Sequence, residues 1–366
     1  MPEGKIRVAI IFGGRSAEHE VSCESARHVA AAMDPTKYDV IPIGISREGR
    51  WMLPDASRKA LEGGVLEIPD GSLVAEGETV NILADPQRRQ IVPADRHSAV
   101  DDISVEVVFP VLHGPYGEDG TVQGLLELAG IPYVGSGVLG SALSMDKEKM
   151  KVMFHAAGLP SPRYVVIREH DWTRQRRRLI DDAPQLGFPC FTKPANLGSS
   201  VGITRCVDPE SLEAGIAEAF LHDRKVLVEE AIIGRELECG VLGNDEPQAS
   251  GVGEVVSVRD FYDYEAKYRD EDSKTIIPAD IPDPVAEVVR NYSIRAFQSV
   301  DAAGLARVDF FYQQDGRGVL INEINTIPGF TTISMFPKLW MATGLSYPNL
   351  IDRLIQLAMQ RHDAKR

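Results

Sequence analysis

The stretch LARVDFFYQQDGRGVLINEIN, residues 305–325, most constrains what this chain can fold into. Two runs of alternating apolar and polar residues flank Asp315 and Gly316, a dipeptide typical of tight turns between antiparallel strands. Side chains two residues apart share one face of a strand. The pattern therefore predicts a hairpin with one polar and one apolar face.

The polar face of this predicted hairpin gathers two carboxylates, an amide and a guanidinium. The expected register sets Asp309 opposite Glu323 and Arg307 opposite Asn325. The other face is expected to carry Val308, Phe310, Leu320, Asn322 and Ile324. Facing carboxylates are costly without a cation, and three oxygen donors suit Mg²⁺ held partly by phosphates. A solvated face with an Arg–carboxylate pair is the alternative, but the apolar flanks favour a metal, beside which Arg307 could hold a phosphoryl group or an oxyanion.

The first part of the chain repeats a strand, a glycine turn and a helix. An apolar strand over 5–12 runs into Gly13-Gly14, and a second over 105–112 ends at His113-Gly114 before a helix from Thr121. This order predicts an α/β domain with a parallel sheet. Residues 46–100 between the halves are polar and punctuated by Gly and Pro, so we interpret them as an insertion to which no function can be assigned.

The remainder reads as α+β, with turn residues dense among its elements. A helix over 145–157 is expected first. It is followed by strands over 164–167, 188–193, 225–229 and 237–242, helices near 210–221, 284–303 and 347–361, and a polar loop over 257–275.

Candidate phosphate ligands lie in the middle of the chain. Lys193 ends an apolar strand before a Gly/Ser loop, and such a loop offers N–H groups to a polyphosphate, although a plain surface turn fits equally well. Lys147 could be a second ligand, but alone it reads as a solvated lysine at a helix start. Glu229 and Glu236 could bind ribose hydroxyls or cap a sheet edge, and spacing favours the edge.

Composition excludes several classes of protein. The 366 residues carry 39 Lys+Arg against 54 Asp+Glu, a net charge of −15, which argues against a broad nucleic-acid surface. The cysteines are widely spaced without a C-x-x-C, so we expect buried free thiols rather than zinc or disulfides. No apolar run approaches a membrane span or a signal-peptide core, so we expect a cytoplasmic protein that contacts no membrane.

Taken together, these segments resemble the D-alanine–D-alanine ligase family of the ATP-grasp superfamily, in the family's order from about residue 6 to 357. The matching strings are GGRSAEHEVS (13–22), HGPYGEDG (113–120), YVGSG (133–137), SMDK (144–147), KP (193–194), GSSVG (198–202), FYDYEAKY (261–268), NEINT (322–326) and PG (328–329). Each string is moderately specific, and their ordered succession is highly specific.

The resemblance implies a three-domain ATP-grasp enzyme with a Rossmann-like N-terminal domain. The expected N-terminal domain covers 1–140 and includes the insertion. The central domain covers 141–232, and the C-terminal domain covers 233–366 and carries the metal site and a lid loop over 257–275. ATP would bind between the second and third. Such enzymes phosphorylate one D-alanine carboxylate, and the amino group of a second D-alanine attacks the acyl phosphate, for peptidoglycan synthesis. A homodimer is also implied.

The resemblance also assigns roles to residues. Asp309, Glu323 and Asn325 would ligate two Mg²⁺ ions, for which Mn²⁺ could substitute. ATP would be bound by Lys147, Lys193, Glu229, Glu236, Lys267, Asn322 and Glu323. The first substrate's ammonium would meet Glu18, linked to the lid through Ser199 and Tyr268. Arg307 and the Gly329 N–H would stabilise the tetrahedral intermediate, with His113 as a further substrate contact and the Ser334 and Met335 N–H groups on the second carboxylate.

Several alternatives remain open from the sequence. Ile327 and Phe330 stand where relatives often carry Ser and Met, and both flank Gly329, so the fit of the second substrate could differ. A D-alanine–D-lactate or D-serine ligase, another ATP-grasp carboxylate–amine ligase, and a catalytically silent nucleotide-binding protein are the competing hypotheses. The YEAKY string at 264–268 favours the dipeptide-forming type.

Overall fold

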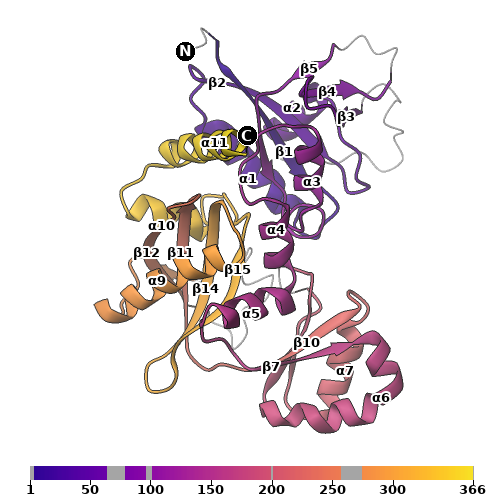
Figure 1. The fold of residues 1–366 in the computed structure, drawn as a ribbon, viewed down its shortest axis with the longest axis vertical. Helices are drawn as coiled ribbons and strands as arrows, with labels where there is room; N and C mark the ends of the chain where they lie inside the picture. Colours follow the sequence, from indigo (N-terminus) through magenta and orange to yellow (C-terminus); the bar gives the residue numbers. More distant parts are fainter. Residues whose placement is uncertain (1–3, 64–78, 96–100, 199–200, 257–273, 366) are drawn as a thin grey trace.

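The computed structural model describes residues 4–63, 79–95, 101–198, 201–256 and 274–365, and these form four sheets with flanking helices (Figure 1). The predicted lid loop over 257–275 therefore lies almost entirely outside the described residues. No helix in the described ranges is long and apolar enough to cross a membrane.

The first sheet is parallel, as the sequence predicted. Its strands, in spatial order, are β2 (Tyr38–Ile45), β1 (Ile6–Gly13) and β6 (Val107–Val111), flanked by α1 (His19–Ala32), α2 (Pro54–Gly63) and α3 (Thr121–Leu128). The central strand β1 is buried on both faces because Val8, Ile10 and Phe12 pack on one side while Ala9 and Ile11 pack on the other. The Rossmann-like prediction is confirmed.

The segment over 46–100 interpreted as an insertion contributes two strands to a small sheet of three. Two antiparallel strands of this sheet, β3 (Val80–Ile82) and β4 (Gln90–Pro93), lie within the segment, and the third, β5 (Ile103–Ser104), follows its predicted end. Val80, Ile82 and Ile91 are buried in the same cluster as Ala9 and Ile11. The segment therefore covers one face of the first sheet.

The second large sheet is antiparallel and covered by helices on one face. It comprises β7 (Tyr164–Arg168), β10 (Lys225–Glu230), β8 (Cys190–Pro194) and β9 (Thr204–Cys206), with α6 (Glu169–Asp182), a 3₁₀ helix (Ala183–Leu186) and α7 (Pro209–Ala219). Helix α7 begins at a capping box in which Asp208 and Ser211 bond each other's backbone N–H. All four cysteines are free, and Cys190, Cys206 and Cys239 are buried, as expected.

The third large sheet holds the predicted hairpin. Its order is β13 (Lys274–Ile276), β12 (Gln248–Val256), β11 (Arg235–Gly243), β14 (Gly304–Gln313) and β15 (Gly318–Asn325). The helices around it are α4 (Val138–Met145), α5 (Lys147–Ala156), α9 (Asp283–Ser299) and α10 (Met335–Ala342). The last helix, α11 (Tyr347–Ala364), leaves this region and packs on the first sheet, where Figure 1 shows it beside α1.

The hairpin register confirms the predicted pairing of Asp309 and Glu323 and corrects the register beyond them. Asp309 pairs with Glu323 and Arg307 with Asn325, as expected, but Phe310 then pairs with Ile321. One extra residue on β15, Asn322, is left without a cross-strand partner. The prediction that Asn322 lies on the apolar face is wrong, because this bulge turns it into the same cavity as Glu323.

Candidate active site

A cavity of about 280 Å³ lies where the first sheet, the four-stranded sheet and the hairpin meet. It collects most of the predicted site residues, namely Glu18, His113, Lys147, Lys193, Glu229, Glu236, Arg307, Asn322, Glu323, Asn325, Gly329, Ser334 and Met335. Asp309 does not line it, and its carboxylate accepts two hydrogen bonds from Arg307. Ser199, Lys267 and Tyr268 fall outside the described residues.

Paired lysines and a buried carboxylate form one wall. Glu229, at the end of β10, meets Lys151 Nζ at 2.6 Å and also pairs with Lys193 of β8. Burial raises the pKa of the Glu229 carboxyl, but the two ammonium groups outweigh it and the net shift is downward. Burial likewise opposes the charged form of Lys193, yet Glu229 keeps its pKa raised. Burial lowers the pKa of Lys151, whereas Lys193 keeps its ammonium group charged at the cavity, which suits a polyphosphate.

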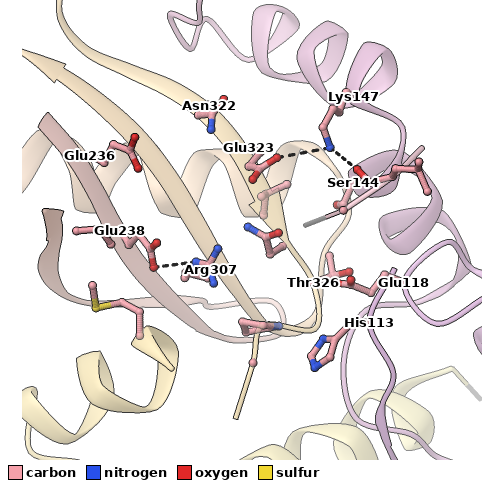
Figure 2. Close-up of a pocket in the computed structure, with 18 of the residues that line it drawn as sticks. His113, Glu118, Ser144, Lys147, Glu236, Glu238, Arg307, Asn322, Glu323 and Thr326 are labelled. Atoms are coloured by element: carbon pink, nitrogen blue, oxygen red, sulfur yellow. Dashed lines mark hydrogen bonds and ion pairs between the residues drawn. The ribbon is translucent and has the colours of Figure 1, made fainter. Parts of the chain in front are cut away.

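A further lysine joins this wall to the hairpin. Lys147, the first residue of α5, donates to the Leu197 carbonyl at 2.8 Å and lies 3.6 Å from Glu323 Oε2, an ion pair drawn in Figure 2. Leu197 begins the Gly/Ser loop that the sequence singled out. Lys147 thus connects that loop to the carboxylate of the hairpin.

The hairpin face is a compact charge network. Arg307 donates to both oxygens of Asp309 at 2.7 Å and also meets Glu238 Oε2 at 2.9 Å. Asn325 Nδ2 donates to Asp309 Oδ2 at 3.0 Å. The Arg–carboxylate pair that the sequence offered as an alternative is present, and each hairpin carboxylate has its own cationic partner.

Whether the hairpin could hold a divalent cation is a question of donor chemistry. Among the described residues no group of three or more His, Cys, Asp or Glu is arranged for a metal ion. The cross-strand trio of Asp309, Glu323 and Asn325 nevertheless offers only hard oxygen donors once the amide is counted. This donor set fits Mg²⁺ rather than zinc.

The opposite end of the cavity belongs to the first sheet. Glu18 directly precedes α1 and is buried, with its Oε2 atom so close to Gly198 that a Cβ there would lie 3.1 Å away. His113 follows β6 and its Nδ1 lies 2.9 Å from the Ile327 carbonyl. Burial lowers the pKa of His113, and a carbonyl can only accept, so the neutral ring carries its proton on Nδ1.

The loop between β15 and α10 completes the lining. Ser334 Oγ accepts from the Thr331 N–H at 3.0 Å, and the Ser334 N–H donates to the Thr331 carbonyl at 3.1 Å. The Ser334 N–H is therefore engaged within its own turn here. Met335 is the first residue of α10, where backbone N–H groups have no helical partner.

Sequence reasoning missed three charged residues of this region. Glu118 lines the cavity and lies within the string HGPYGEDG, while Glu238 lines it two residues after Glu236, the spacing that places both on one face of β11. Lys151 follows Lys147 by one helical turn, a spacing that could have shown that both share a helix face.

A parallel α/β sheet, followed by two antiparallel sheets that enclose lysines and carboxylates, defines an enzyme of the ATP-grasp class. Family models described as D-ala D-ala ligase N-terminus and D-ala D-ala ligase C-terminus match residues 7–136 and 153–356. The chain belongs to the D-alanine–D-alanine ligase family.

Individual relatives agree across the whole length. A D-alanine–D-alanine ligase of Geobacillus kaustophilus is 49% identical over 362 residues, 99% of this chain and 96% of that protein. Among solved structures, the VanG D-Ala:D-Ser ligase of Enterococcus faecalis has a TM-score of 0.84 at 36% identity, covering 97% of this chain and 100% of that one. The D-alanine–D-alanine ligase of Coxiella burnetii has a TM-score of 0.83 at 36% identity, covering 99% and 96%.

Proposed function

We propose that this chain joins two D-alanines into D-alanyl-D-alanine, converting ATP to ADP and phosphate, for peptidoglycan precursor synthesis. Family membership supports the reaction. The observation that carries it is that one cavity holds the lysine wall at one end and Glu18 with His113 at the other, with Arg307 on the hairpin face.

The residues suit a two-step acyl transfer. An oxygen of the first D-alanine carboxylate attacks the γ-phosphorus of ATP and ADP leaves, which converts a poor acyl donor into an acyl phosphate. The amino nitrogen of the second D-alanine, after losing a proton, then attacks the acyl carbon, and phosphate leaves. Lys147 and Lys193 hold the ATP phosphates, while Arg307 and the Gly329 N–H face the charge that develops on oxygen.

The remaining assignments follow the family resemblance. Glu18 holds the first substrate's ammonium, His113 contacts substrate, and the Ser334 and Met335 N–H groups receive the second carboxylate. Glu229, Glu236 and Asn322 contact the nucleotide. Ser199, Tyr268 and Lys267 would connect Glu18 to the 257–275 lid and reach the transferred phosphate, excluding water.

Asp309, Glu323 and Asn325 would hold two Mg²⁺ ions, with Mn²⁺ as a substitute. Asn325 already gives an amide hydrogen to Asp309, so it would offer its Oδ1 atom. The cations would neutralise charge on the phosphoryl oxygens.

The resemblance further supports a cytoplasmic homodimer without nucleic-acid or membrane partners, divided into domains over 1–140, 141–232 and 233–366. Sedimentation of the purified chain would test the dimer.

The choice of second substrate is the point at which relatives differ, since a D-Ala:D-Ser ligase is among the similar structures. Phosphate release from ATP with Mg²⁺ should be measured with D-alanine, D-lactate, D-serine, L-alanine or no amino acid, and products identified by mass. We expect release with D-alanine alone, giving the dipeptide. A mixed D-Ala–D-Ser or ester product would overturn the second-substrate assignment, and no turnover with any of them would overturn the enzyme assignment.

A further inference from the structure

The four-residue run Ile327-Pro328-Gly329-Phe330 is held by side chains from distant parts of the chain. The Ile327 N–H donates to Glu118 Oε1 at 3.0 Å, and the Ile327 carbonyl accepts from His113 Nδ1 at 2.9 Å. Both partners come from the turn after β6, more than 200 residues earlier. The peptide groups on either side of Ile327 are thus fixed to the first sheet.

Phe330 is held in the same way on the other side. Its N–H donates to Ser25 Oγ of α1 at 3.1 Å, and its carbonyl accepts from the Tyr347 hydroxyl at 2.8 Å. The Phe330 ring packs at right angles to Phe109, with centroids 5.9 Å apart, so the side chain points into the core and not into the cavity. The Met-to-Phe difference noted in the sequence therefore falls on the packed side of the loop.

Between these anchors lies the peptide that carries the Gly329 N–H. Pro328 fixes its own φ and lacks an N–H, and a Cβ at Gly329 would come within 2.7 Å of Ser334 Oγ. In the described part of the chain, the Gly329 N–H donates no hydrogen bond. A donor with no partner of its own, between two fixed peptides, is preorganised for an oxygen that acquires charge only during reaction.

We propose that Glu118, Ser25 and Tyr347, together with the Nδ1 of His113, are positioning residues that fix the Gly329 N–H for the developing oxyanion. The inference rests on the proposed function for the oxyanion itself. It extends that function to Glu118, Ser25 and Tyr347, which need not touch substrate. The position of Glu118 in the HGPYGEDG string does not by itself reveal this role. The inference also implies that the backbone of residue 327 is held by Glu118 and His113 whatever its side chain, whereas that buried side chain lines the cavity.

Glu118 can serve in either protonation state, since each oxygen of a carboxylate or carboxylic acid keeps a lone pair. One oxygen accepts from Ile327 and the other from the Gly114 N–H at 2.8 Å. Glutamine has one oxygen and one NH₂ group, so Glu118→Gln must lose one of these bonds. Tyr347→Phe removes only the hydroxyl and keeps the ring against Phe330.

The chain offers a matched control for each variant. Tyr133→Phe removes a hydroxyl that donates to Glu127 Oε1 over 2.6 Å, a bond outside the loop. Glu106→Gln alters a carboxylate that accepts a 2.9 Å hydrogen bond from the Arg7 N–H at the far end of the first sheet. With D-alanine and ATP, Glu118→Gln and Tyr347→Phe should lower kcat about tenfold or more, while KM values change less than about threefold. Both controls should keep the wild-type kcat.

Two further readouts separate positioning from simple loss of fold. A phosphinate mimic of the tetrahedral intermediate should lose affinity in each variant by the same factor as kcat. Hydrogen exchange of the 326–331 backbone, measured without substrates, should be faster in the variants and unchanged in the controls. Unchanged kcat and exchange, or a fall in kcat with full affinity for the mimic, would overturn the proposal. A wild-type chain that makes no dipeptide would instead overturn the proposed function, and the exchange result would still decide whether these residues hold the loop.

Discussion

At the scale of single residues, Glu118 has an environment that disfavours the charged form of its carboxyl. It lies beside Glu18 at the wall of the cavity, and loss of contact with water together with that neighbouring charge raises the pKa of its carboxyl to about 8, although two backbone N–H groups and Arg307 oppose the shift. A carboxyl with such a pKa binds a proton in the folded chain at pH values where the unfolded chain has already released it.

This difference predicts how stability depends on pH. Because the folded state holds the extra proton between about pH 4.5 and 8, Glu118 should lower the free energy of unfolding by about 1.4 kcal/mol per pH unit as pH rises through that window, with no further change above it. Urea unfolding of the wild type and Glu118→Gln across this range should show a difference that changes with pH in this direction. A constant difference would mean that Glu118 titrates normally.

Glu323 tests the metal face at the same scale. Glu323→Gln keeps the shape of the side chain and leaves Lys147 its bond to the Leu197 carbonyl, so the fold should persist. Loss of the carboxylate charge from the proposed cation site should reduce turnover at least about a hundredfold. It should also abolish the extra thermal stabilisation that the protein gains when Mg²⁺ is added together with ATP. Wild-type turnover with Mg²⁺ in this variant would refute the assignment of the metal face.

At the scale of elements, the hairpin shows what the sequence could and could not predict. Strict alternation of apolar and polar residues fixed which residues of β14 and β15 share a face, so the pairing of Asp309 with Glu323 was predictable. The bulge at Asn322 was not, because an extra residue breaks the period locally without changing composition. The bonds of Ile327 to Glu118 and His113 were also hidden, since no local pattern reports contacts between residues so far apart in sequence.

Two glycines in helices offer a paired test of element packing. A Cβ at Gly140 of α4 would lie 2.4 Å from the Asp301 carbonyl oxygen, whereas a Cβ at Gly124 of α3 would meet nothing within 4 Å. Gly140→Ala should therefore destabilise the protein by about 1–3 kcal/mol by pushing α4 from the turn at 301–302. Gly124→Ala should stabilise it by about 0.5–1 kcal/mol, because alanine favours the helix and nothing obstructs it. Thermal unfolding of both variants measures this, and the same sign for both would show that the α4 contact relaxes freely.

At the scale of the whole molecule, α11 near the C-terminus packs against β1 near the N-terminus. Its apolar face packs in the cluster that also holds Val8, Ile10 and Phe12 of β1, so the C-terminal helix closes the N-terminal sheet (Figure 1). Figure 1 also shows that the four-stranded sheet lies apart from this contact, at the other end of the molecule. The first sheet and the region around the hairpin are thus expected to unfold together.

Leu354→Ala tests this coupling. Leu354 is fully buried in that cluster, so its truncation should cost about 2–5 kcal/mol, whereas Gln356→Ala on the exposed face of the same helix should cost less than about 0.5 kcal/mol. Hydrogen exchange resolves where the loss falls. Because β1 and α11 share one core, amides of 6–13 and of 347–364 should lose protection together, while those of β10 in the separate sheet change less. If only α11 exchanged faster and β1 kept its protection, α11 would unfold locally without the first sheet. The bond from Tyr347, in the first turn of α11, would then break with the helix, and the loop would have to hold Phe330 without it.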